Sequence, residues 1–261
     1  MAISMETVTR VEKDPWFQYV KTSRRGRLRL FCLHYAGGGA SIYRQWGTLL
    51  PPEIELYPIQ LPGRENRWQE APYTRVEELM QPLARGLLPY LDKPFVLFGH
   101  SMGALISFEL TRYLRRHNLP MPLHLFASAH RAPQLPYSQE KVHALSQEEF
   151  LACLERLGTM SQEILSNEEA MEIYTPLLRA DFSLCERYSY LAEPPLACSI
   201  SAYGGLFDER VSRQEMAAWN MQSNGAFVLN MFPGDHFFLQ SNQNLLLQNL
   251  SQILTRFVEQ I

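Results

Sequence analysis

The stretch that decides the fold is residues 95–104, which read FVLFGHSMGA. Four apolar residues suited to a buried strand lead into the pentapeptide GHSMG, and helical spacing of apolar residues follows from Met102 to Arg116. A serine between two glycines at a strand-to-helix junction is typical of a sharp turn that pushes the hydroxyl outward. Glycine is needed on either side because larger side chains would collide with neighbouring backbone. The sequence therefore predicts a nucleophilic serine at Ser101.

Outward from this turn, strand-like and helix-like segments alternate along the chain. Runs rich in β-branched and aromatic residues predict strands at Leu28–Leu33, Ile54–Ile59, Phe95–Phe98, Leu123–Ala127, Cys198–Tyr203 and Ala226–Phe232. Helical spacing predicts helices around Ile42–Leu50, Val76–Leu91, Met102–Arg116 and a last segment with Leu246, Leu250 and Leu254. Such alternation predicts an α/β fold, with a mostly parallel central sheet and helices on both faces.

The alternation stops between residues 130 and 195, where helical patterns dominate. Ser146 followed by Glu149 indicates a capping box at the start of one helix, and Asn167 is a candidate cap for a second. Ligands of open α/β sheets bind near the carboxyl ends of the strands, so we expect this insertion to be a lid. A helical bundle without a role in the site is the alternative. We expect one domain, residues 1–261, with the helical lid insertion at 130–195 inside it.

A serine hydroxyl needs a base that removes its proton and an acid that orients the base. Asp208 and His236 each follow a late strand, in the order Ser, Asp, His that such a strand–turn–helix site uses. His130, after the fourth strand, is the rival base, and Glu209 and Asp235 are the rival acids. The other histidines fit less well by position: His34, His100, His117, His124 and His143.

A tetrahedral intermediate also needs two N–H donors for its oxyanion. The amide of Met102 is one candidate, and Ala36 in the loop HYAGGGA at residues 34–40 is the other. The consecutive glycines of this loop do not fit the Gly-x-Gly-x-x-Gly pattern, so a nucleotide cofactor is not expected. The four cysteines are far apart and lack zinc spacing, so no metal is expected either.

Composition and charge exclude several classes of function. The chain has 261 residues, with 24 Lys and Arg against 27 Asp and Glu, a balance that offers no cationic field for nucleic acid. No apolar run approaches the roughly 18 residues of a membrane span. The first fifteen residues lack the basic start and apolar stretch of a secretory signal, so we expect a cytoplasmic protein.

Five segments together resemble a known family. They read LHYAGGGASIYRQW at 33–46, LPGRENR at 61–67, GHSMGA at 99–104, RADF at 179–182 and FPGDHFFL at 232–239. Over about residues 27–258 this pattern is similar to type II thioesterases, the stand-alone editing enzymes of nonribosomal peptide and polyketide synthesis, which have the α/β-hydrolase fold.

The resemblance implies the site residues by position. Ser101 corresponds to the nucleophile, Asp208 to the orienting acid and His236 to the base, with Ala36 and Met102 as the oxyanion-hole donors. Two positions depart from the family pattern, which usually has Pro at His34 and often Gly at Asp235. A carboxylate at Asp235 should raise the pKa of the neighbouring base, because it favours the charged imidazole.

The resemblance also implies the reaction and its partners. The substrate would be an acyl thioester on the phosphopantetheine arm of an acyl or peptidyl carrier protein, hydrolysed by a monomeric enzyme without a cofactor of its own. Arg112, Arg115 and Arg116 are a candidate docking patch, with a solvated helix end as the alternative. The alternative functions are a medium-chain acyl thioesterase of fatty acid synthesis, a small-molecule esterase or acyltransferase, and a catalytically silent binding module.

Overall fold

The computed structural model describes residues 14–137, 140–158, 160 and 162–261, and within them a six-stranded sheet forms the centre of the molecule. All neighbouring strands pair in parallel, in the order β2-β1-β3-β4-β5-β6. The strands are β1 (Leu28–Leu33), β2 (Ile54–Pro58), β3 (Phe95–His100), β4 (His124–Ser128), β5 (Ser199–Gly205) and β6 (Phe227–Phe232). The predicted parallel sheet is confirmed.

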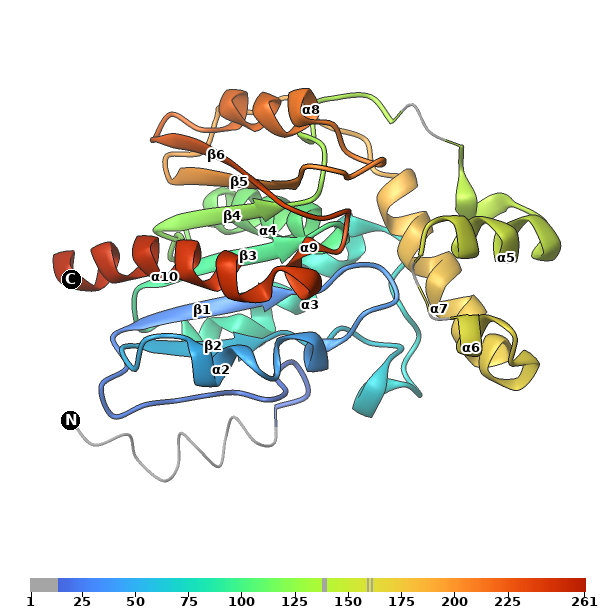
Figure 1. Ribbon diagram of the computed structural model, residues 1–261. Helices are drawn as coiled ribbons and strands as arrows, with labels where there is room; N and C mark the ends of the chain where they lie inside the picture. Colours follow the sequence, from blue (N-terminus) through green and yellow to red (C-terminus); the bar gives the residue numbers. More distant parts are fainter. Residues whose placement is uncertain (1–13, 138–139, 159, 161) are drawn as a thin grey trace.

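Helices cover both faces of the sheet because side chains of the strands alternate between two apolar cores. Along β1, Phe31 and Leu33 belong to one core, and Leu28, Leu30 and Cys32 to the other. The first core contains α3 (Val76–Leu87), α4 (Met102–Arg116) and α8 (Arg213–Ala217); the second contains α2 (Trp46–Leu49), α9 (Phe238–Ser241) and α10 (Gln243–Gln260). Figure 1 shows α10 on one face of the sheet, with α3 and α4 on the other.

Among the described residues, three helices lie between β4 and β5, and we call the segment 142–186 the helical insertion. After the short turn η4 (Val142–Ala144) come α5 (Gln147–Arg156), α6 (Gln162–Leu165) and α7 (Glu168–Glu186). Ser146 forms the predicted capping box with Glu149, and the Asn167 side chain accepts the Ala170 N–H. The insertion stands beside one end of the sheet (Figure 1) and has its own small core of Phe150, Leu154, Met171 and Leu178.

Two predicted helices differ from the observed ones in extent. The segment 42–50 divides into a 3-10 turn, η1 (Ala40–Tyr43), and the short α2. The segment 76–91 leaves α-helical geometry after Leu87 and ends as η3 (Leu88–Tyr90), because Pro89 has no N–H to continue the α-helical hydrogen bonds. The remaining 3-10 turns are η2 (Glu65–Arg67) and η5 (Ala218–Gln222). No helix among the described residues is long and apolar enough to cross a membrane.

Candidate active site

The turn between β3 and α4 holds Ser101 in a strained conformation. Its backbone has φ 53° and ψ −118°, a region that side-chain-bearing residues rarely adopt. A Cβ at Gly99 would lie 2.1 Å from the carbonyl oxygen of Gly103, and one at Gly103 would lie 2.1 Å from that of Leu33. The Ser101 N–H donates to the Ser128 carbonyl at 2.7 Å. The two glycines are therefore required for the close backbone approach that projects the serine from the sheet.

Ser101, His236 and Asp208 form a continuous hydrogen-bonded chain. The Oγ of Ser101 lies 3.0 Å from Nε2 of His236, and Nδ1 of His236 lies 2.8 Å from Oδ2 of Asp208. A carboxylate only accepts, so Nδ1 carries the proton and Nε2 is free to accept from the hydroxyl. The other carboxylate oxygen accepts the N–H groups of Arg210 and Val211 at 2.8 and 3.2 Å. These bonds fix the orientation of the acid.

Burial lowers the pKa of His236 below its ordinary value. Desolvation is the largest cause; Asp208 opposes it through its hydrogen bond and its charge. The charge of Arg210 lowers the pKa further, whereas Asp235 raises it, in the direction expected from the sequence. Burial outweighs the two carboxylates. The imidazole is therefore neutral near pH 7 and able to accept a proton.

His100 positions the loop that carries His236, a role that sequence reasoning did not find. Its Nε2 donates to the backbone carbonyl of His236 at 2.9 Å, and its Nδ1 accepts from the Ser128 hydroxyl at 2.8 Å. Burial and the neighbouring His236 and Arg210 hold the pKa of His100 well below its ordinary value. Gly205 also makes room for this loop, because a Cβ there would lie 2.3 Å from the carbonyl oxygen of Asp235.

The glycine-rich loop leaves the sheet beside the serine. Leu33 pairs with Gly99 across β1 and β3, so residues 34–40 begin next to the sharp turn. Ala36 lines the same cavity as Ser101, and Met102 opens α4, where the first amides of a helix have no acceptor inside the helix. His34, at the start of the loop, is buried; desolvation and Arg64 lower its pKa to about 3, and its Nδ1 donates to the Tyr35 carbonyl.

A buried ion pair ties the helical insertion to this loop. Both oxygens of Asp181 in α7 accept from Arg64, at 2.8 Å each, and Oδ2 also accepts the Gly37 N–H at 2.8 Å. Arg64 donates further to the carbonyls of Pro62 and Gly38, so it orders the LPGRENR segment as well. The side chains of Arg64 and Asp181 are 5% and 2% exposed. The segments LPGRENR and RADF, which contain Arg64 and Asp181, thus meet at the loop that carries Ala36.

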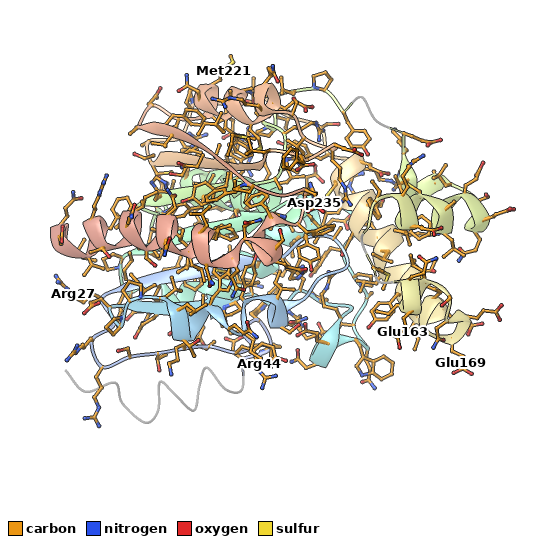
Figure 2. All side chains as sticks on the ribbon, in the orientation of Figure 1. Arg27, Arg44, Glu163, Glu169, Met221 and Asp235 are labelled. Carbon is orange, nitrogen blue, oxygen red and sulfur yellow. The ribbon has the colours of Figure 1, made fainter. Side chains whose placement is uncertain are left out.

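A cavity of about 680 Å³ opens over the serine. Its walls come from the sheet side through Ala36, Ser101 and His236, and from the helical insertion through apolar residues such as Val142, Leu157 and Phe182. Asp235, labelled in Figure 2 between the sheet and the insertion, lines it at an exposed position, as does Glu209.

The rival residues have other partners. His130 lines the cavity, but its Nδ1 donates to the Arg131 carbonyl, and its own carbonyl accepts from Trp219. Asp235 accepts the Phe237 N–H. The other histidines that sequence reasoning set aside bind elsewhere: His117 to the Tyr113 carbonyl, His124 to Ser201 and His143 to Glu186.

The candidate docking patch on α4 is largely paired within the chain. Arg112, Arg115 and Arg116 all bind Glu193, and Arg112 also binds Glu109. Two carboxylates thus offset two of the three positive charges that the patch offers to an acidic partner. All four cysteines are free thiols, and the described residues contain no cluster of His, Cys, Asp or Glu suited to a metal ion.

Comparisons with known proteins show the family to which the chain belongs. Residues 28–254 match the family described as Thioesterase domain. The chain is 44% identical to "Linear gramicidin dehydrogenase LgrE" of Brevibacillus parabrevis over 96% of both chains. It is 43% identical to "Gramicidin S biosynthesis protein GrsT" of Aneurinibacillus migulanus over 92% of this chain and 93% of that one.

A solved structure extends the comparison to three dimensions. The type II thioesterase BorB from the borrelidin biosynthetic cluster superimposes with a TM-score of 0.83 and 33% identity, covering 92% of this chain and 97% of that one. The name of LgrE describes a dehydrogenase, but the glycine-rich loop here lacks the dinucleotide pattern, and a serine turn with a hydrogen-bonded histidine and aspartate occupies the site. The chain therefore belongs to the thioesterase family, as a type II enzyme and serine hydrolase of the α/β-hydrolase fold.

Proposed function

We propose that this enzyme hydrolyses acyl thioesters on the phosphopantetheine arms of carrier proteins, and so frees carriers blocked by mis-primed or stalled acyl groups. The observation that carries the proposal is the hydrogen-bonded chain of Ser101, His236 and Asp208 at the floor of a 680 Å³ cavity. Relatives named for gramicidin S biosynthesis and the borrelidin cluster support a role in nonribosomal peptide or polyketide synthesis.

In the first half of the reaction, Ser101 is acylated. Its Oγ attacks the thioester carbonyl while its proton moves to Nε2 of His236, 3.0 Å away. The N–H groups of Ala36 and Met102 stabilise the oxyanion. The carbon–sulfur bond then breaks, and His236 returns the proton to the departing thiolate of the phosphopantetheine arm.

In the second half, water takes the place of the serine. His236 accepts a proton from the water, whose oxygen attacks the acyl-enzyme ester, and the same proton is given to Oγ of Ser101 as the free acid leaves. Asp208 keeps Nδ1 protonated through both halves and stabilises the imidazolium. We assign the helical insertion the role of a lid, because it supplies much of the cavity wall. We expect a monomer that acts in the cytoplasm.

The decisive experiment is intact-mass spectrometry of an acetyl-loaded carrier protein with the wild type and with Ser101→Ala. We expect loss of the acetyl mass with the arm retained, and no loss with the variant. If the acetyl carrier survived while nitrophenyl esters were cleaved, only a small-molecule esterase would remain. Labelling of Ser101 by a fluorophosphonate separates either enzyme from a silent binding module.

A further inference from the structure

Arg131 is a cation of the catalytic cavity that forms no ion pair with any residue in the described part of the chain. It lines the same cavity as Ser101 and His236. Its Nε is buried without a hydrogen-bond partner, and its guanidinium lies over the Tyr137 ring, 4.9 Å from the centroid. The more deeply buried arginines differ, because each binds at least one carboxylate: Arg29, Arg64, Arg67 and Arg112.

The carboxylates nearest to Arg131 are engaged by other donors. Glu186 accepts from the Val142 and His143 backbone N–H groups, from Tyr137 and from the His143 ring. Glu215 accepts the backbone N–H and the hydroxyl of Ser212 in the capping box of α8. The charge of Glu215 still raises the pKa of Arg131, but among the described residues neither carboxylate forms an ion pair with it, and its buried Nε has no hydrogen-bond partner.

Such an arrangement is costly unless a ligand completes it. Desolvation lowers the pKa of Arg131, although nearby Cys185, Tyr137 and Glu215 act in the opposite direction. Arginine stays charged in proteins even so, and a charged donor that is removed from water without an acceptor destabilises the folded state. A polar group placed in a binding cavity is a usual means of fixing the orientation of a ligand.

We propose that Arg131 binds an oxygen of the acyl chain beyond its thioester carbonyl, so that the enzyme selects acyl groups with a keto, amide or carboxylate oxygen over plain alkyl groups. This inference rests on the proposed function, because it concerns the acyl group that Ser101 receives. The cavity of about 680 Å³ has room for such a chain between the serine and the helical insertion.

The test uses carrier proteins loaded with acyl groups that differ in one feature. Acetoacetyl and butyryl groups have the same chain length and differ by one carbonyl oxygen, and a malonyl group adds a carboxylate. The value of kcat/KM for each loaded carrier is measured by intact mass with the wild type, Arg131→Met and Arg131→Lys. Arg187→Met is the matched control, since Arg187 is an exposed arginine at the end of α7, outside the cavity lining.

We expect the acetoacetyl-to-butyryl ratio of kcat/KM to fall roughly tenfold to a hundredfold in Arg131→Met, the usual range for one hydrogen bond to a charged group. Arg131→Lys should fall between it and the wild type, and Arg187→Met should keep the wild-type ratio. If the malonyl-to-butyryl ratio falls more than the acetoacetyl-to-butyryl ratio, the preferred group is a carboxylate. If the two ratios fall equally, the preferred group is a neutral carbonyl.

A ratio that is the same in the wild type and Arg131→Met would overturn the inference. Partial misfolding of the variant would lower the acetoacetyl and butyryl rates by the same factor, so it does not change their ratio. If Arg131→Met gives no measurable enzyme, the ratio in Arg131→Lys decides in the same way. A wild type that hydrolyses none of the loaded carriers would instead refute the proposed function.

Discussion

Replacing Asp181 by Asn should destabilise the enzyme strongly, although the two side chains have nearly the same shape. The change leaves the Arg64 guanidinium buried without its counter-charge, since the two side chains are only 5% and 2% exposed. Breaking a buried ion pair by removing one partner costs about 3–5 kcal/mol. At about 2–4 °C per kcal/mol for a chain of roughly this size, the melting temperature should fall by roughly 6–20 °C.

The cause can be separated from a general defect of α7 by a double-mutant cycle. Thermal and urea unfolding are measured for Asp181→Asn, for Arg64→Met and for the double variant that carries both changes. The double variant should recover much of the loss, because no buried charge is left uncompensated. Glu172→Gln, at an exposed position of the same helix, is the control. An Asp181→Asn enzyme that melts within about a degree of the wild type would refute the reasoning.

The same substitution should reduce activity. Asp181 accepts the Gly37 N–H at 2.8 Å, and Gly37 adjoins Ala36, the proposed oxyanion donor. If the loop loosens, kcat should fall. The upper limit of the fall is roughly 10²–10³-fold, the effect of removing one oxyanion donor from a serine hydrolase. Rates are to be measured well below the melting temperature of the variant, so that unfolding does not contribute. An unchanged kcat would show that the loop holds its position without α7.

Three further predictions concern the turn, the base and acid stability. Gly103→Ala should abolish activity or folding, because its Cβ would lie 2.1 Å from backbone; a fully active variant would contradict this steric reading. Activity should fall as acid protonates His236, and Asp235→Asn should shift that limb of the pH–rate profile to lower pH by removing a charge that raises the pKa; an unmoved limb would exclude the effect. The free energy of unfolding should fall below about pH 6.5, because the histidines bind protons in the unfolded chain but stay neutral in the folded one. The expected slope is about 1.4 kcal/mol per pH unit per histidine. Their folded pKa values are about 4 for His124 and about 3 for His34 and His130, so a urea-unfolding series between pH 6.5 and 4 tests the slope, and a flat series would contradict it.

Local patterns predicted those elements whose apolar residues are continuous or regularly spaced. β1 at Leu28–Leu33 and α4 at Met102–Arg116 have the predicted bounds, because one is buried on both faces and the other carries its apolar face to its last turn. The capping box of Ser146 was equally readable, since both partners lie within one helical turn. The proximity of Ser101, Asp208 and His236 could be predicted for a different reason. Each residue lies just after a strand, and parallel strands end at one edge of the sheet.

Contacts between segments that are distant along the chain could not be predicted from the sequence. Arg64 and Asp181 are far apart along the chain, and neither segment alone indicates that its charge is buried. The role of His100 was missed because it depends on the backbone carbonyl of His236, an acceptor that every residue has. The split of segment 42–50 into η1 and α2 was missed because apolar spacing alone does not distinguish a 3-10 turn from the start of an α-helix.

The helical insertion contacts both loops on which the chemistry depends. Asp181 of α7 binds Gly37 beside the proposed oxyanion donor, whereas the Leu157 carbonyl, just after α5, accepts from Arg210. The backbone N–H of Arg210 in turn donates to Asp208, the proposed orienting acid. The walls of the cavity are therefore bonded to the loop of the proposed oxyanion donor on one side and to the loop of the proposed acid on the other. A displacement of the helical insertion would accordingly be transmitted to both loops.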